Sequence, residues 1–285
     1  MQEDINIQWF PGHMTKARRM IADNLKLVDA VCEIVDARIP YASRNPDLDS
    51  IAGAKPRLLI LNRIDQADPA VTKRWAAAYR SAGLSVLETD SKNGKGTAGF
   101  PDAVRRILKD KIEAYAAKGQ AGRTIRLMIV GIPNVGKSSF INRVAGRKAA
   151  EASDRPGVTR GKQWITLGPG LELLDTPGIL WPKFDSQTVA ENLAFTGAVK
   201  DQILDREALA AKLLLRLRDV CPEKLAERYK IDLTSDDGVA LLTAAAKKRG
   251  FLLPGGVVDT ERMAVILLDE FRGGRLGRVS LERPE

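Results

Sequence analysis

The fold of this chain is decided by residues 128–139, which read Met128-Ile129-Val130-Gly131-Ile132-Pro133-Asn134-Val135-Gly136-Lys137-Ser138-Ser139. The apolar run from Ile125 to Val130 predicts a buried parallel strand, and the pattern after it predicts a helix that stops at Gly146. Between them stands G-x-x-x-x-G-K-S, the pattern of a phosphate-binding loop (P-loop). In such a loop backbone N–H groups face phosphate oxygens, Lys137 contacts the β- and γ-phosphates, and the Ser138 hydroxyl is offered to Mg²⁺. We therefore expect this nucleotide-binding set: Asn134, Val135, Gly136, Lys137, Ser138 and Ser139.

Length and composition limit the number of domains and the class of protein. The 285 residues suffice for one large α/β domain and a smaller one, and 44% hydrophobic with 28% charged residues is ordinary for a globular protein. No apolar stretch is long enough to span a bilayer, and the acidic start is unlike a targeting peptide, which favours a cytoplasmic protein without a membrane partner. Cys32 and Cys221 have neither metal-site nor disulfide spacing.

The charge is uneven along the chain. The net charge is +9, of which residues 200–285 carry +1 and the first 199 residues +8. A polyanionic partner such as RNA is therefore expected mainly on the first part of the chain, with Arg272, Arg275 and Arg278 as a local basic exception. The alternative, that the lysines only solvate a nucleotide-binding domain, fits the charge equally well.

A second motif, Asn62-Arg63-Ile64-Asp65, follows a predicted strand at residues 58–61. It resembles the guanine-recognition motif N-K-x-D of GTP-binding proteins. The Asp65 carboxylate can accept both the ring N–H and the amino group of guanine, which adenine does not offer in that arrangement. Arg63 replaces the usual lysine, whose stem lies against the base; an arginine stem can do this too, but its head is bulkier. Taken alone, the tetrapeptide could equally be a strand end and a turn.

A third loop, Asp90-Ser91-Lys92-Asn93-Gly94, leaves the next predicted strand at residues 84–87. It stands where GTPases carry S-A-K-x-G, and only the lysine and the glycine match. We expect Ser91 and Lys92 to lie on the guanine side of the site. A long helix from about Pro101 to Lys118 then leads to the P-loop strand.

Beyond the P-loop, a segment rich in proline and glycine places Thr159 where it can reach Mg²⁺ and the γ-phosphate. A predicted hairpin, residues 163–167 and 171–174, ends in Asp175-Thr176-Pro177-Gly178. Asp175 would hold Mg²⁺, usually through water, and the Gly178 N–H would bond the γ-phosphate and be released on hydrolysis. The expected Mg²⁺ set is therefore Ser138, Thr159 and Asp175.

After Phe184 the pattern is helical, at about 189–199, 206–220, 223–229, 237–249 and 260–271, with no catalytic constellation. We therefore predict an α/β P-loop GTPase domain with a parallel-rich sheet over residues 1–185. A smaller all-α domain over residues 186–285, made for contact, follows it.

The order of the motifs is unusual. Most GTPases present the P-loop, the switch threonine, D-x-x-G, N-K-x-D and S-A-K in that order, whereas here the two guanine motifs come first. This is a circular permutation, which leaves the packed strands in place. Because the chain now passes from Gly178 almost directly into the helices, GTP binding is expected to reorient residues 186–285.

Together these motifs, with Trp9-Phe10-Pro11-Gly12-His13-Met14 and Asp36-Ala37-Arg38-Ile39-Pro40, make the chain similar to the circularly permuted bacterial GTPases that assemble the large ribosomal subunit, the ribosome biogenesis GTPase A family. The resemblance implies a late-acting assembly factor whose GTPase is stimulated by the ribosomal particle. Its helical domain would contact rRNA and ribosomal proteins, and we expect a monomer off the ribosome. The alternative is a nucleotide-gated RNA-binding GTPase of another pathway, such as tRNA modification or small-subunit maturation.

Hydrolysis needs a group that orients water, and the usual glutamine after D-x-x-G is replaced by Ile179. The resemblance assigns that role to His13, the one histidine of the sequence; otherwise His13 would only close a turn before the first helix. The expected catalytic residues are His13, Lys137 and Thr159. Asn134 resembles the asparagine of potassium-activated GTPases, where its carbonyl helps to hold K⁺; the competing interpretation is an ordinary loop residue.

Overall fold

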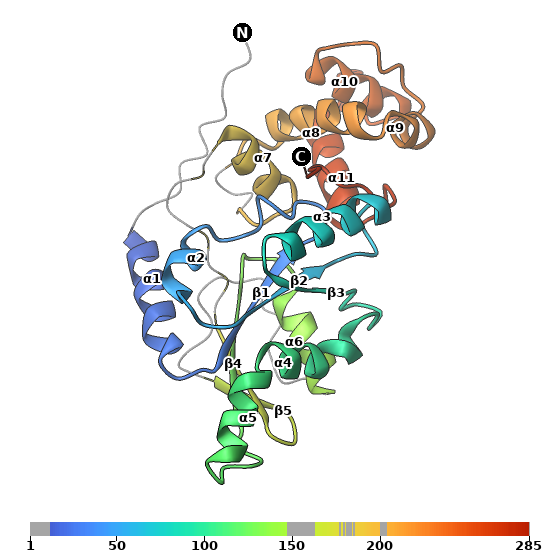
Figure 1. The fold of residues 1–285 in the computed structure, drawn as a ribbon. Helices are drawn as coiled ribbons and strands as arrows, with labels where there is room; N and C mark the ends of the chain where they lie inside the picture. Colours follow the sequence, from blue (N-terminus) through green and yellow to red (C-terminus); the bar gives the residue numbers. More distant parts are fainter. Residues whose placement is uncertain are drawn as a thin grey trace.

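The computed structural model describes residues 12–146, 163–176, 178, 180, 184, 186–199 and 204–284, with the backbone alone for residues 12–18 and 163. The described residues form a sheet flanked by helices, with a group of further helices lying over one end of the sheet (Figure 1). The strand order is β3-β2-β1-β4-β6-β5. The strands are β1 Ala30–Asp36, β2 Arg57–Asn62, β3 Ser85–Glu88, β4 Ile125–Gly131, β5 Gln163–Gly168 and β6 Leu171–Asp175.

The first five strands in that spatial order run parallel, and only β5 at the edge is antiparallel. The central strand β1 is buried along its whole length because β2 and β4 flank it and helices cover both faces. It is therefore apolar on both faces, apart from the buried Glu33 and Asp36, instead of alternating between apolar and polar residues. The predicted hairpin of β5 and β6 is confirmed, with Trp164 opposite Leu174.

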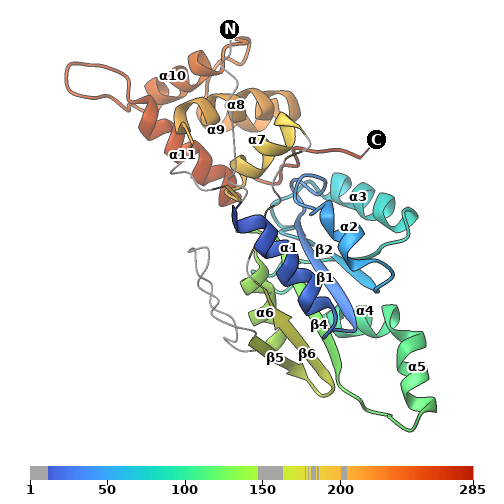
Figure 2. The same cartoon turned by 90° about the vertical axis from the view of Figure 1, so that its left-hand side faces the viewer.

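Alternate residues of the strands contact different helices. On one face, Val31 and Met128 pack with α1 Gly12–Leu25 and α2 Asp47–Ala52, and Leu59 packs with α3 Pro69–Ser81. On the other face, Ile34 and Ile129 belong to the cluster that contains α4 Phe100–Ile107 and α6 Lys137–Ala145. Figure 2 shows α1, α2 and α3 on the same side of the sheet. The predicted α/β class is therefore confirmed.

The expected long helix over residues 101–118 is wrong in its continuity. The structure has α4, which ends at Ile107, and then a separate α5, Lys109–Ala117. Leu108 between them leaves the helical region, at φ −109° and ψ 12°, while its side chain stays buried in the core. No residue of α5 is buried, so packing of a shared apolar face does not hold the two helices in line.

The helices after the sheet are α7 Gln187–Phe195, α8 Arg206–Val220, α9 Pro222–Tyr229, α10 Gly238–Lys248 and α11 Thr260–Arg272. Helix α8 lies at their centre, and its Leu209, Leu213 and Leu217 are fully buried. Side chains of Asp205 and Asp259 accept backbone N–H groups at the starts of α8 and α11, as expected for N-caps. Among the described helices, none has the length and apolar character needed to cross a membrane. The boundary at residues 185 and 186 stays a prediction.

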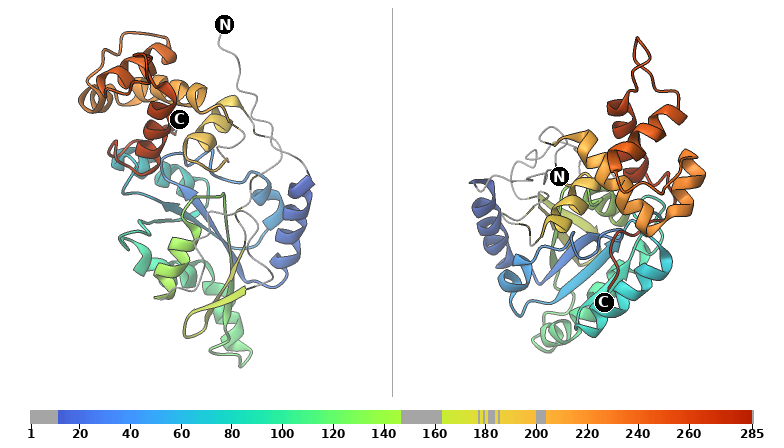
Figure 3. Two further views of the ribbon diagram at one scale, coloured as in Figure 1. Left: turned by 180° about the vertical axis from the view of Figure 1, so that it is seen from behind. Right: turned by 90° about the horizontal axis from the view of Figure 1, so that it is seen from above.

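After α11 the chain returns to the sheet domain. The N–H of Val279 donates to the carbonyl of Gln66 at 2.8 Å, and that of Leu281 donates to the carbonyl of Arg38 at 2.9 Å. The carboxylate of Glu282 accepts the N–H groups of Tyr41 and Ala42. We call residues 276–284 the C-terminal strap; Figure 3 shows it leaving the helices and running back towards α3.

Candidate functional site

The parallel strands bring the predicted motifs to one edge of the sheet. Asn62 ends β2, the P-loop follows β4, and Asp175 ends β6, so all three lie at carboxyl ends of parallel strands of one sheet. That edge is where open α/β sheets bind their ligands. The helices α7 to α11 lie beyond this same edge (Figures 1 and 2). Motifs from the early and late parts of the chain therefore share one site.

Within the P-loop two residues adopt the left-handed backbone region. Asn134 has φ +60° and Gly136 has φ +92°, and α6 begins at Lys137 directly after them. Ser138 and Ser139 lie in the first turn of α6. Because the first N–H groups of a helix have no intrahelical acceptor, this arrangement turns donors towards a phosphate group.

Asn62 joins the guanine motif to the P-loop. Its Nδ2 donates to the carbonyl of Val135 at 2.9 Å, and its Oδ1 accepts the N–H and the hydroxyl of Ser91 at 3.2 and 2.7 Å. The residue is buried, and the three loops after β2, β3 and β4 meet at its side chain. A Cβ on Gly136 would lie 2.5 Å from that Nδ2, so only glycine fits there.

Ser91 and Lys92 are placed by a turn around Asp90. The Asp90 carboxylate accepts the N–H of Lys92 at 2.9 Å and that of Asn93 at 3.0 Å. From the other side, the guanidinium of Arg143 in α6 donates to the backbone carbonyls of Ser91 and Lys92. Arg143 was not foreseen from the sequence, since no motif marks a helix residue that supports this loop.

Asp65 lies half-buried after β2. Burial raises the pKa of its carboxyl above the ordinary value, and the neighbouring Asp90 carboxylate adds to this, against opposing effects of Arg63 and Lys92. N–H donors stabilise the charged form of a carboxylate in such a place, because they replace the water that burial removes. The ring N–H and amino group of guanine are donors of this kind.

The P-loop lysine is paired with the carboxylate at the end of β6. Lys137 Nζ forms a short ion pair with Asp175, and about a tenth of each side chain is exposed, 10% and 8%. Gly178 lies against the P-loop, where a Cβ would be 3.0 Å from the Cα of Pro133. A bound phosphate with its cation would thus meet a positive charge on Lys137 and a negative charge on Asp175.

Several expected residues lie wholly or partly outside the described part of the chain. Thr159 and Ile179 are outside it, and of His13 only the backbone is described, in the first turn of α1. Asn134 has its Nδ2 bonded to the carbonyl of Gly197 at 2.6 Å. The potassium assignment to Asn134 therefore stays a hypothesis about its carbonyl oxygen.

The segment Asp36-Ala37-Arg38-Ile39-Pro40, at the end of β1, ties the helices to the sheet. Asp36 and Arg38 are buried and form a two-point ion pair, with Nε to Oδ1 at 3.0 Å and Nη2 to Oδ2 at 2.7 Å. Burial would raise the pKa of Asp36, but the Arg38 guanidinium outweighs it and holds that pKa below its ordinary value. Arg38 Nη1 also donates to the carbonyl of Phe271 at 3.0 Å. The sequence shows this segment as a motif, but the contact of Arg38 with Phe271 could not be predicted from it.

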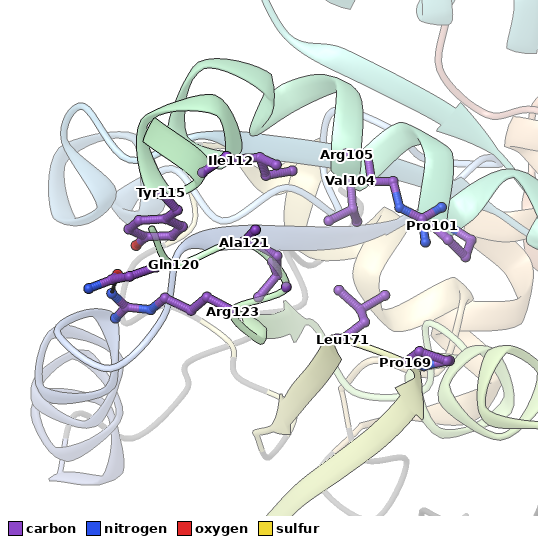
Figure 4. A pocket seen from close by; sticks show the side chains of 14 residues that line it. Pro101, Val104, Arg105, Ile112, Tyr115, Gln120, Ala121, Arg123, Pro169 and Leu171 are labelled. Carbon is purple, nitrogen blue, oxygen red and sulfur yellow. Dashed lines mark hydrogen bonds between the residues drawn. The ribbon is translucent and has the colours of Figure 1, made fainter. Parts of the chain in front are cut away.

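A cavity of about 340 Å³ lies away from this edge. It is lined from α4, α5, the connection into β4 and the β5–β6 turn, and Figure 4 shows Val104, Tyr115, Arg123 and Leu171 around it. Ile125 at the start of β4 borders it, whereas the P-loop follows the other end of β4. The cavity is therefore separate from the nucleotide loops.

The chain is similar to known proteins over nearly its whole length. A family model described as "50S ribosome-binding GTPase" matches residues 126–240, beginning in the P-loop strand. Ribosome biogenesis GTPase A of Priestia megaterium is 48% identical over 281 residues, covering 98% of each chain. The Bacillus cereus protein of the same name is 47% identical and covers 98% of this chain and 94% of its own. The chain belongs to the ribosome biogenesis GTPase A family.

A solved structure agrees with this assignment. The GNP-bound YlqF from T. maritima matches with a TM-score of 0.67 and 31% identity, over 95% of this chain and 99% of that chain. As a member of the ribosome biogenesis GTPase A family, the protein is a GTPase, and the predicted permuted P-loop fold is confirmed. GTP and GDP are its nucleotides.

The residues present suit a Mg²⁺ ion carried with the nucleotide. Within the described ranges, no group of three or more His, Cys, Asp or Glu side chains could hold a metal by itself. Mg²⁺ in P-loop GTPases takes hydroxyl oxygens of the protein, phosphate oxygens and waters, which needs few protein ligands. Of the described residues, Ser138 at the start of α6 and Asp175 at the end of β6 would hold the ion. The ion would neutralise charge that develops on the phosphates during hydrolysis.

Proposed function

We propose that this GTPase is an assembly factor for late maturation of the large ribosomal subunit, with its hydrolysis stimulated by the ribosomal particle. The observation that carries the nucleotide part is the Asn62 side chain, which joins the loop of Asp65 to the P-loop and to Ser91. The ribosomal part is supported by the printed names of the relatives and of the family model.

In this proposal each loop has a separate task. Asp65 accepts the donors of guanine, with Asn62, Arg63, Ser91 and Lys92 forming its surroundings. Lys137, the N–H groups of residues 134–139 and Gly178 contact the phosphates. Ser138, Thr159 and Asp175 hold Mg²⁺.

Water is oriented by His13, since Ile179 offers neither a donor nor an acceptor. His13→Ala should therefore slow particle-stimulated hydrolysis by about 100-fold or more, the range of positioned acid–base groups, while GTP binding stays within a few-fold. The measurement is single-turnover hydrolysis at saturating protein, with a fluorescent nucleotide titration beside it. Unchanged turnover would remove His13 from the mechanism. In the same assay, equal rates in K⁺ and Na⁺ would reject K⁺ binding at Asn134.

The helices over residues 186–285 are the second functional part of the proposal. They lie over the edge of the sheet that carries the P-loop. The chain passes from the sheet to these helices shortly after Asp175 and Gly178. GTP binding would therefore shift their placement, and with it the surface offered to rRNA and ribosomal proteins.

The deciding experiment is a GTPase assay with and without purified large subunits, with ATP as the nucleotide control. The proposal expects stimulation by large subunits, none by small subunits or tRNA, and no ATP hydrolysis. Co-sedimentation with large subunits should be strongest with a non-hydrolysable GTP analogue and should weaken as salt rises, because phosphate contacts release counterions. Binding to tRNA or small subunits instead would favour the alternative pathway.

A further inference from the structure

Arg63 stands where the guanine motif ordinarily has lysine, and its guanidinium contacts two parts of the chain far from it in sequence. Nη2 donates to the backbone carbonyl of Asn134 in the P-loop at 2.6 Å. Nη1 lies 3.4 Å from the carbonyl of Arg272 at the end of α11. Nε lies 3.7 Å from the Asp36 carboxylate, which also pairs with Arg38. The head of Arg63 therefore bridges the P-loop and the helices.

Asn134 makes a second connection between the same parts. Its Nδ2 donates to the carbonyl of Gly197, the residue that follows the last turn of α7, at 2.6 Å. Asn134 also holds a left-handed backbone, φ +60°, which is uncommon for a residue other than glycine. Two contacts hold the P-loop in this conformation. The backbone carbonyl of Asn134 accepts from Arg63, and its side-chain amide donates to Gly197.

The two contacted helix ends are fastened to each other. Arg272 Nε donates to the carbonyl of Phe195 at 3.1 Å, and Nη2 donates to that of Ala194 at 2.9 Å. A Cβ on Gly197 would lie 3.2 Å from Arg272 Nε, so the turn after α7 packs closely on this side chain. Movement of the P-loop at Asn134 is therefore opposed by α7 and α11 together.

A lysine could not make the same bridge. Its ammonium is a single point with rotatable donors, whereas the guanidinium is a rigid planar fork that can address carbonyls in different directions. Burial lowers the pKa of Arg63, and the Asp36 carboxylate opposes that effect. The group keeps its charge all the same, because arginine is effectively always protonated in proteins.

We infer that Arg63 is a positioning residue that couples the P-loop to the helical part, joining the Asn134 carbonyl to the Arg272 carbonyl. When the P-loop closes on a nucleotide, Asn134 moves, and the ends of α7 and α11 must follow or lose their bonds. This deepens the proposed reorientation of residues 186–285 and rests on it. The route runs through the P-loop itself, in addition to the short connection after Gly178.

The test measures the distance between the two parts by pulsed spin-label spectroscopy. Labels are placed on the exposed positions Lys118→Cys in the sheet domain and Lys248→Cys in α10. The native thiols will not compete, because Cys32 and Cys221 are buried and burial raises their pKa values to about 12 and about 11. The full chain is measured without nucleotide, with GDP and with a non-hydrolysable GTP analogue, each at saturation.

The unsubstituted chain should give a nucleotide-dependent shift of the distance distribution, and Arg63→Lys should reduce that shift to half or less. Arg44→Lys is the matched control, since Arg44 is another partly buried arginine whose ion pairs, to Glu33 and Asp49, stay within the sheet domain. It should keep the full shift. If Arg63→Lys also keeps the full shift, the coupling role is refuted. If the unsubstituted chain gives no shift, the reorientation and the coupling fail together, while particle-stimulated hydrolysis is tested separately.

A second measurement separates coupling from a loss of folding. Arg272→Lys loosens the fastening between α7 and α11 that opposes movement of the P-loop, so it should strengthen GTP-analogue binding by about tenfold, within the usual range of coupling between sites. The same substitution in an Arg63→Lys background should have a smaller effect, because the Arg63 bridge from the P-loop to the end of α11 is already lost. Independent, multiplicative effects on affinity would contradict the proposal. Thermal melting of each variant verifies that it is folded.

Discussion

Gly136 is the residue on which the P-loop depends most directly. Its φ of +92° disfavours any side chain, and a Cβ would press on the Asn62 amide at 2.5 Å. Gly136→Ala should therefore break the contact between Asn62 and Val135, cost about 1–3 kcal/mol of folding free energy and abolish tight GDP binding. Fluorescent GDP titration and urea unfolding measure the two effects.

Gly146, at the other end of α6, provides the control for that substitution. It also has a positive φ, +66°, but a Cβ there would meet nothing within 4 Å. Gly146→Ala should therefore cost about 1 kcal/mol of stability through backbone strain and leave GDP affinity unchanged. If Gly146→Ala weakens GDP binding as much as Gly136→Ala does, strain alone explains the loss and the Asn62 contact does not.

Asp65 should decide the base at the same site. Asp65→Asn replaces one acceptor by a donor, so guanine loses a partner for its N–H groups, whereas xanthine, which has a carbonyl in place of the amino group, gains one. GTP affinity should fall by about 100-fold or more, and affinity for xanthosine triphosphate should rise. Competition binding with GTP, xanthosine triphosphate and ATP measures this. An unchanged preference for GTP would place guanine recognition elsewhere.

The sequence predicted where the motif residues lie better than which residues they contact. Asn62 and Lys137 could be placed at strand ends because each motif follows an apolar run. The bond between Asn62 and Val135 could not be foreseen, since it joins residues 73 apart through the packing of the sheet. Arg63 was expected beside the base, and the contacts of its head with Asn134 and Arg272 depend on where the helices lie.

Among the elements, the C-terminal strap has a titratable anchor. Burial raises the pKa of Glu282 to about 7, against hydrogen bonds from Asn192 and from the N–H groups of Tyr41 and Ala42. Because this folded-state value exceeds the ordinary 4.5, the stability it contributes is complete below about pH 4.5 and is lost as pH rises through about 7. The strap should therefore be held more weakly at pH 8 than at pH 5.

Urea unfolding at pH 5 and pH 8 measures this contribution. The unsubstituted chain should lose on the order of 1 kcal/mol more than Glu282→Gln does over that interval, since glutamine does not titrate. Other titrating groups, such as the buried Glu33, are common to both proteins and cancel in the difference. Parallel pH profiles of the two proteins would show that Glu282 does not titrate in this range.

Elements with strong periodicity were predicted from sequence, and those fixed by remote packing were not. The helix at residues 206–220 and the β5–β6 hairpin have clear apolar patterns and turn residues, and both are confirmed. The break between α4 and α5 was missed because Leu108 looks like one more apolar position of a single helix. The strap carries no periodic pattern, so its contacts with Gln66 and Arg38 could not be predicted.

At the scale of the whole molecule, the sheet and the helices share bonds at Arg38, Arg63, Asn134 and the strap. Calorimetric unfolding should therefore give one transition for both parts. GDP at about 100 times its dissociation constant should stabilise that transition by about 2.7 kcal/mol, and ATP should not. Two transitions, of which GDP moves only one, would mean that the parts unfold independently.

The permuted strand order also fixes when the nucleotide site is completed as the ribosome synthesises the chain. The guanine half, with Asn62 and Ser91, emerges well before the phosphate half with Lys137 and Asp175. Since chains fold as they emerge, from the N-terminal end, β1 to β3 must wait for β4 before their central edge is covered. A nascent chain arrested before residue 131 thus carries the base loop without a phosphate cradle, and it cannot retain GTP until its translation is well past the midpoint of the sheet domain.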